Sequence, residues 1–287
     1  MTNFVKGLVG AALGVAAMAA TALELSGPLV QGALVQGRVD PGARVAFNDR
    51  PLRVSDEGVF VFGLGRDAPA AGVIRVTHAD GGTEERRLAI RQRDYEIQRI
   101  DGLPPRKVTP PAAALERIRA EARQAREARR RDAPRTDFLG GFQWPVEGII
   151  TGVYGSQRIL NGEPRRPHYG IDIAAPTGTP VRAPAGGVVT LVHEDMFFSG
   201  GTLIVDHGHG VSSTFLHLER ILVAEGERVR QGDVIAEVGA TGRVTGAHLD
   251  WRMNHFSERL DPVLVAGPMP SSGGGKGPAP EQAEGER

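Results

Sequence analysis

Residues 202–218 read TLIVDHGHGVSSTFLHL, and this stretch decides the fold. Two runs rich in β-branched and aromatic residues, Thr202–Val205 and Val211–Phe215, flank a segment that contains Gly208 and Gly210. Two such runs around a glycine-bearing turn are typical of an antiparallel hairpin. The surrounding region, 138–267, is rich in Val, Ile, Gly and Pro, so we expect it to consist mostly of antiparallel strands.

The region from residue 23 to residue 100 also has a β pattern. Short runs such as Val59-Phe60-Val61-Phe62 are separated by turn sequences such as Asp40-Pro41-Gly42. Many short strands with frequent turns predict a small antiparallel sandwich, and the piece resembles Ig-like accessory modules. The fold class predicted for the chain is therefore mainly β, with an N-terminal β-sandwich-like module, a helical linker and a C-terminal antiparallel sheet.

The composition changes between residues 101 and 137, which predicts a linker. Pro104-Pro105 and Pro110-Pro111 bracket a stiff stretch, and Ala112–Arg131 consists almost entirely of the helix formers Ala, Arg and Glu. Few residues there are apolar beyond alanine, so we expect a solvated helix. Its excess of arginines also suits contact with an anionic envelope surface. The tail, 268–287, consists mostly of Pro, Gly, Ser and Glu, lacks the apolar content needed to pack and is predicted to be disordered.

The first 22 residues have the pattern of a secretory signal peptide. Lys6 precedes an apolar run from Gly7 to Ala19, and Ala20-Thr21-Ala22 fits the small-residue rule for cleavage. An uncleaved membrane anchor is the alternative, although the run is short for a spanning helix. We therefore expect an exported protein, without a transmembrane helix after cleavage, in the periplasm or elsewhere in the cell envelope.

The composition also limits the chemistry of the chain. Because there is no cysteine, any metal must be held by histidine and carboxylate ligands. Lys plus Arg equals Asp plus Glu, 34 against 34, so the net charge indicates no polyanionic partner. The arginine-rich segment lacks interleaved aromatic residues, which argues against nucleic acid as a partner.

Histidines gather in the C-terminal region, where six of the eight lie between His168 and His248. The sequence His168-Tyr169-Gly170-Ile171-Asp172 places an imidazole and a carboxylate four residues apart. Residues i and i+4 of a regular strand face the same side, so this pair offers two zinc ligands to one point. By itself the pair is weak evidence for a metal site.

Further segments strengthen this interpretation when they are read in chain order. They resemble the lysostaphin/LytM family of zinc metallopeptidases over about Gln143 to Pro262, which implies a LytM-type peptidase domain with zinc as its cofactor. The segments that carry the resemblance are HYGID (168–172), PTGTPV (176–181), APAGGVV (183–189), TLIVDHG (202–208), TFLHL (214–218), VRQGDVIA (229–236) and TGAHLD (245–250).

The resemblance implies a role for each residue that matches the family's motifs. His168 and Asp172 correspond to zinc ligands, and His217 corresponds to a histidine that assists catalysis. The family ends on a His-x-His motif, in which the first histidine assists catalysis and the second binds zinc. Here His248 keeps the first place, whereas Asp250 stands in the second.

The aspartate at position 250 leaves two functions open. Strand alternation still points Asp250 to the side of His248, and a carboxylate oxygen reaches zinc at roughly 2.0–2.2 Å. A second carboxylate should weaken the pull of zinc on a bound water. The first function is an exported zinc endopeptidase that hydrolyses peptidoglycan peptides through an activated water. The alternative is a degenerate relative that binds the cell wall or activates another wall hydrolase.

Three further expectations concern where side chains lie. The ligand atoms of His168, Asp172 and Asp250 should converge to within about 4 Å, with His217 and His248 beside them. Tyr154 and Arg158 occupy a loop region that lines the groove of the family, so they are candidates for substrate contact. His255 is expected at the surface.

Overall fold

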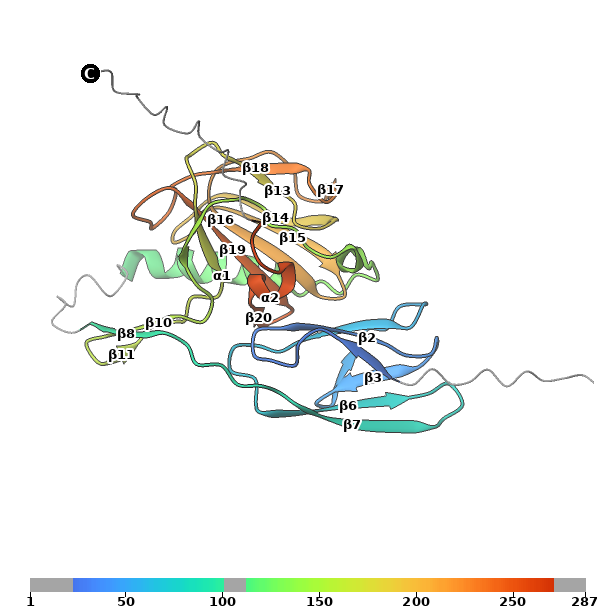
Figure 1. Ribbon diagram of the computed structural model, residues 1–287. Coiled ribbons are helices and arrows are strands. Elements are labelled where there is room, and N and C mark those ends of the chain that lie inside the picture. The colour runs from blue at the N-terminus through green and yellow to red at the C-terminus, as the bar shows by residue number, and fades with distance from the viewer. Residues whose placement is uncertain (1–22, 101–111, 271–287) are drawn as a thin grey trace, which may run out of the picture.

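A computed structural model describes residues 23–100 and 112–270, and Figure 1 shows it. Strands dominate both halves of the described chain, which confirms the predicted mainly β class. The expected signal peptide, the first part of the predicted linker and most of the predicted disordered tail lie outside the described residues. Within the described ranges, no helix is long and apolar enough to cross a membrane.

Two small antiparallel sheets form the N-terminal lobe, with the strand orders β1-β2-β5 and β4-β3-β6-β7. Val35 and Phe60 of the first sheet share one buried cluster with Ile74 and Val76 of the second, as a sandwich requires. The strands are β1 (Glu24–Ser26), β2 (Leu34–Arg38), β3 (Arg44–Phe47), β4 (Arg50–Leu52), β5 (Val59–Gly63), β6 (Ala71–Thr77) and β7 (Thr83–Ala89).

A ten-stranded sheet forms the C-terminal lobe, and the hairpin of residues 202–218 lies at its centre. Its main path runs β17-β14-β15-β16-β19-β12-β9, and every pairing along that path is antiparallel. The strands are β9 (Ile149–Gly152), β12 (Ile171–Ala174), β13 (Pro180–Arg182), β14 (Gly187–Met196), β15 (Gly200–Gly208), β16 (Val211–Ile221), β17 (Arg228–Val229), β18 (Val234–Val238), β19 (His248–His255) and β20 (Glu258–Leu260).

The sheet has two faces of different character. Side chains of directly paired residues lie on the same face, so the register defines both. One row joins Leu203, Phe215 and Trp251, which are all fully buried in the main core, and we call this the apolar face. A neighbouring row joins Asp172 to Asp250, and we call this the site face.

Helix α1 (Leu115–Ala128) lies along the sheet of the C-terminal lobe (Figure 1). Its Ala125 and Ala128 pack against Leu191 and Ile204. Ile204 pairs with Thr214, which pairs with Arg252 two residues from Asp250, so the helix covers part of the site face. The segment forms the predicted helix and most of its residues are exposed, as expected for a solvated helix, while small alanine side chains let one side of it pack on the sheet.

Polar contacts fix the first half of α1. The carboxylate of Glu121 accepts a hydrogen bond from the backbone N–H of Phe197 at 2.9 Å and pairs with Arg117 at 2.7 Å. Arg117 also reaches Asp195 near the end of β14 at 3.1 Å. The helix is preceded by the 3-10 turn η2 (Ala112–Ala114) and followed by η3 (Asp137–Gly140).

The two lobes share a buried contact. The backbone N–H of Gly63 donates a hydrogen bond to Nδ1 of His255 at 3.2 Å, and Val61 belongs to the core of the C-terminal lobe. His255 is therefore buried, and its expected place at the surface is wrong. The strand β8 (Ile97–Ile100), predicted to belong to the N-terminal module, pairs in parallel with β10 (Gln157–Leu160), which also pairs with β11 (Glu163–Pro164).

Candidate metal centre

Three side chains converge on the site face: Asp172 and Asp250 lie on the adjacent strands β12 and β19, and His168 lies in the segment just before β12. One ligand atom from each of His168, Asp172 and Asp250 lies within 4.8 Å of the others. Nε2 of His168 is 3.0 Å from Oδ1 of Asp172 and 3.6 Å from Oδ2 of Asp250. The side chains of Asp250, His168 and Asp172 are 3%, 20% and 26% exposed, so the cluster opens to solvent on the side of the latter two.

The pairing of β12 with β19 creates this arrangement. Asp172 and Asp250 are direct partners across the two strands, and like charges in that relation are destabilising by themselves. A cation between them removes this penalty. The glycine of the HYGID segment is also required, because a Cβ on Gly170 would lie 2.5 Å from Oδ1 of Asp250.

The ring of His168 is oriented for metal binding. Its Nδ1 lies 3.2 Å from the backbone carbonyl oxygen of Val153, which can only accept, so Nδ1 carries the hydrogen and Nε2 points at the carboxylates. That Nε2 atom is buried and has no aligned hydrogen-bond partner. Burial lowers the pKa of His168, but Asp172 and Asp250 outweigh it and raise the pKa to about 10. An imidazole and two carboxylates around an unsatisfied nitrogen fit a divalent ion such as zinc.

A β-bulge brings His217 to the same point. In a regular strand, His217 would face the core together with Phe215, but Leu218 occupies the core instead. His217 has a φ of 65°, a left-handed conformation that is uncommon outside glycine, and β16 changes partner there from β19 to β18. The bulge thus turns the side chain to the site face, as bulges near functional sites commonly do.

His217 and His248 form a pair beside the three ligand residues, with ring centroids 4.8 Å apart. Nδ1 of His217 contacts the carbonyl oxygen of Thr241, and Nδ1 of His248 contacts that of Gly246, each at 2.9 Å. In the neutral rings, both Nε2 atoms are therefore proton acceptors. Burial, which outweighs the opposing hydrogen bond to Thr241, lowers the pKa of His217, so this ring is neutral at neutral pH.

Asp250 has a second partner that changes the charge of the site. Both of its oxygens accept hydrogen bonds from Arg252, with Nε at 3.0 Å and 3.1 Å and Nη2 at 2.5 Å from Oδ2. Burial would raise the pKa of Asp250, but Arg252 and His168 outweigh burial and hold that pKa well below its usual value. The pair with Arg252 does not draw Asp250 away from His168.

The two candidates for substrate contact are not brought to the cluster. Tyr154 is 3% exposed, and its hydroxyl donates a hydrogen bond to the backbone carbonyl of Arg259 at 2.7 Å, so it offers no surface to a substrate. Arg158 is exposed on β10, and its contact with substrate stays a prediction. Arg252 lies on the same face as Asp250, because residues two apart along a strand point to the same side.

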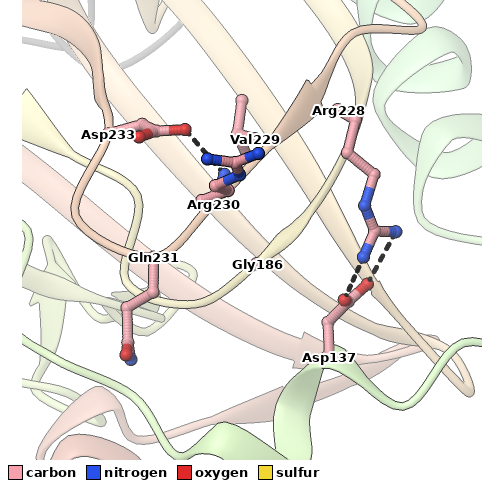
Figure 2. A pocket seen from close by; sticks show the side chains of 7 residues that line it. All are labelled: Asp137, Gly186, Arg228, Val229, Arg230, Gln231 and Asp233. Atoms are coloured by element: carbon pink, nitrogen blue, oxygen red, sulfur yellow. Dashed lines mark hydrogen bonds and ion pairs between the residues drawn. The ribbon is translucent and has the colours of Figure 1, made fainter.

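A separate pocket lies at the junction of η3 and β17 (Figure 2). Its charged groups pair with one another: Arg228 bonds to both oxygens of Asp137, and the backbone N–H of Arg230 donates to Asp233. None of its lining residues belongs to the metal cluster. The pocket therefore lies where η3 meets β17 and is separate from the metal cluster.

Comparison with known proteins agrees with this geometry. Residues 166–262 match the sequence profile of Peptidase family M23. The DD-carboxypeptidase/endopeptidase Mpg of Neisseria meningitidis is 45% identical over 105 residues, which are 37% of this chain and 24% of that protein. Peptidoglycan DD-endopeptidase ShyA of Vibrio cholerae is 36% identical over 121 residues, covering 39% of this chain and 28% of that protein.

The likeness to one solved structure extends much further. A crystal structure from Pseudomonas aeruginosa, assigned to peptidase M23, is 31% identical and superposes with a TM-score of 0.66. The match covers 83% of this chain and 95% of that one, whereas the chain spans about a quarter of the length of the two curated relatives. On this agreement across both lobes, the chain belongs to peptidase family M23.

Proposed function

We propose that this protein is a zinc metalloendopeptidase that hydrolyses peptide bonds of peptidoglycan. The observation that carries the proposal is the convergence of His168, Asp172 and Asp250, with the His217–His248 pair directly beside them. Three protein ligands that leave a position open for water are typical of catalytic zinc sites, whereas structural sites are closed by four.

His168, Asp172 and Asp250 would hold the zinc, which when bound lowers the pKa of a water molecule and polarises a peptide carbonyl. Two carboxylates would neutralise the ion formally, which was the reason to expect a slower enzyme. Arg252 supports a different conclusion, because its charge offsets that of Asp250 through paired hydrogen bonds. The Asp250–Arg252 pair therefore has the net charge of the neutral histidine that the family places at position 250.

The two flanking histidines would move the protons. His217 is the group that we assign as the acceptor, because its ring is neutral and its Nε2 carries the free lone pair. His248 has its Nε2 3.9 Å from Oδ1 of Asp172, and we assign it, when it carries a proton on Nε2, to donate a hydrogen bond to the negative charge that develops on the carbonyl oxygen.

The substrate and the location follow from the relatives and from the sequence. Two relatives are named as endopeptidases, and one of these names specifies peptidoglycan DD-endopeptidase. Peptidoglycan peptides as substrate require export to the periplasm or cell envelope, which agrees with the predicted signal peptide. Contact of the arginine-rich helix with an anionic envelope surface remains part of this proposal, through its exposed Arg119, Arg123 and Arg130.

One observation favours a second function, that of a metal-free wall-binding protein or activator of another hydrolase. Arg252 occupies hydrogen-bonding positions on both oxygens of Asp250 and competes with a metal for that carboxylate. The proposed enzyme needs Asp250 to serve Arg252 and zinc together, which its four lone-pair positions permit.

The deciding experiment measures bound zinc and the release of peptides from purified peptidoglycan on the same preparations. Wild type should hold one zinc per chain and release peptides, whereas Asp250→Ala and His168→Ala should lose both properties together. His78→Ala, which changes a histidine of the N-terminal lobe, is the control and should retain both. Full zinc and full hydrolysis in Asp250→Ala would exclude Asp250 as a ligand. Wild type that binds peptidoglycan without zinc or cleavage would establish the second function.

A further inference from the structure

A group of arginines lies beside the metal centre and comes from separate parts of the chain. We call Arg129, Arg166, Arg252 and Arg259 the arginine cluster. Arg252 is on β19, Arg259 is on β20 opposite Asn254, and Arg129 follows the last turn of α1. Because Asp250, Arg252 and Asn254 alternate along one strand, the cluster continues the site face away from the metal ligands.

The positive charges of this cluster are only partly balanced. Arg252 pairs with Asp250, but Arg259 meets neutral groups: its Nη1 donates to Oδ1 of Asn254 at 3.3 Å, and its guanidinium lies 5.4 Å from the ring centre of Tyr169. Among the residues that the structure describes, no carboxylate forms an ion pair with Arg129 or Arg259. Both side chains are half-buried, so water screens these charges incompletely.

The electrostatic consequence appears in the pKa values. Burial and then the charges of Arg129 and Arg252 lower the pKa of Arg259 to about 9. Burial and then the charge of Arg252 lower the pKa of Arg129 to about 10. Half-buried guanidiniums that repel one another cost stability, and groups with strongly perturbed pKa values beside a candidate site are themselves candidates for a functional role.

Two unsatisfied hydroxyl groups lie on the same face as the cluster. Thr214 pairs across the strands with Arg252, and Ser212 pairs with Asn254. Thr214 is 3% exposed and Ser212 is 2% exposed, and neither side-chain oxygen has a hydrogen-bond partner. Buried polar groups are normally satisfied, so these two hydroxyls are unpartnered hydrogen-bond donors on the face that carries the cluster.

We infer that the arginine cluster binds a carboxylate group of the peptide substrate, next to the bond that is cleaved. The inference rests on the proposed function and adds a substrate class to it, namely peptides with a free carboxylate near the scissile bond. Guanidinium groups bind carboxylates through two parallel hydrogen bonds, which fixes orientation as well as charge. Arg252 belongs to the cluster and also pairs with Asp250, so the cluster adjoins a proposed metal ligand.

The test uses Arg129→Gln and Arg259→Gln, with Arg123→Gln on the exposed side of α1 as the matched control. The probes are two synthetic cross-link peptides, identical except that the carboxylate beside the scissile bond is free in one and a carboxamide in the other. With full-length zinc-loaded protein, we expect each cluster variant to raise KM for the free acid about ten-fold. KM for the carboxamide, kcat, and both constants of the control should remain unchanged.

Thermal unfolding separates this role from a purely structural one. Removing an unbalanced cation relieves repulsion, so Arg129→Gln should unfold at the same temperature as wild type or higher. A lower unfolding temperature with KM unchanged for both peptides would mean that the arginines serve the fold, and the inference would be wrong. If Arg259→Gln loses zinc, the KM values of Arg129→Gln test the inference instead, because Arg129 contacts no proposed ligand in the described structure.

The outcomes also distinguish this inference from the proposed function. Equal cleavage of both peptides by wild type and variants would overturn the carboxylate site and leave the peptidase intact. If neither peptide is cleaved, the affinities of the zinc-loaded protein for the two peptides decide. Preference for the free acid that is lost in Arg259→Gln would support the site without the activity, and no preference would overturn it.

Discussion

The two faces of the C-terminal sheet are made from the same strands and have opposite chemistry. On the apolar face, Phe215 and Trp251 are fully buried and carry no charge. On the site face, Leu216 and Asp250 are paired, each one residue away from Phe215 and Trp251 on its strand, and Asp250 begins the charged row. Strand alternation alone separates the part of the molecule that is used for stability from the part that is used for chemistry.

The histidines show the same contrast. His168 lies between two carboxylates on the site face, which raise its pKa to about 10 against the effect of burial. His207 and His255 lie at the apolar face, where burial lowers the pKa of each to about 4. Without a metal, the same residue type is therefore favoured as a cation on one face and as a neutral packing group on the other, and the following predictions test the division between the faces.

The largest effect is expected from His217→Ala on the site face. Loss of a positioned proton acceptor should lower kcat about 10²–10⁴-fold, while bound zinc and the unfolding temperature stay close to those of wild type. Steady-state hydrolysis, metal analysis and calorimetry on one preparation would check this. Loss of zinc together with activity would make His217 a ligand and would contradict the assignment.

Phe215→Ala, two residues earlier on the same strand, should have the opposite signature. Removal of a fully buried aromatic ring should lower the free energy of unfolding by about 3–5 kcal/mol. The kcat of the protein that remains folded should change by less than about two-fold, because the ring faces away from the site. Urea denaturation with kinetics at low temperature measures both, and a large fall in kcat at full folding would show that the faces are coupled.

Acid should weaken the apolar face through its buried histidines. The unfolded state binds the proton of His255 near its usual pKa of 6.5, whereas the folded state binds it only near pH 4. The stability due to neutral His255 is thus complete above pH 6.5 and falls by up to about 3 kcal/mol as the pH drops to 4. His255→Gln should unfold with a shallower pH dependence over this window in urea titrations, and an identical slope would contradict the lowered pKa.

The smallest expected effect concerns the charge partner of Asp250. Arg252→Gln should weaken zinc binding about 10–100-fold, as loss of a residue that orients a ligand commonly does. Asp250→His should make zinc binding depend less on Arg252. The double variant Asp250→His/Arg252→Gln should therefore bind zinc more tightly than Arg252→Gln alone. Competition with a metal chelator measures all four affinities, and strictly additive effects would show that Arg252 does not compensate for Asp250.

Much of the site was predictable because its information is local. His168 and Asp172 lie in one short segment, and His248 and Asp250 alternate on one strand, so spacing alone places each pair. The prediction that the two pairs converge across β12 and β19 came from the resemblance to a known family. The observed separation, within 4.8 Å, is slightly wider than the expected 4 Å.

Other features depend on contacts between distant segments and could not be read from the sequence. The docking of α1 uses Ala125 and Ala128, and alanines on an arginine-rich helix indicate no particular partner. Arg129 and Arg259 are 130 positions apart, and no local pattern joins them. Tyr154 was assigned by its place in a loop, whereas the fold buries it beneath the chain at Arg259.

The bulge at His217 has a consequence for anyone who aligns or redesigns this strand. The alternation of buried and site-facing side chains changes phase at His217. Before it the odd-numbered Phe215 faces the core, and after it the even-numbered Leu218 does. A one-residue deletion here would restore a uniform phase, and it would exchange an imidazole for a leucine at the proposed reaction centre. A mutant library designed with one uniform alternation along β16 will therefore place hydrophobic residues on the wrong face on one side of His217.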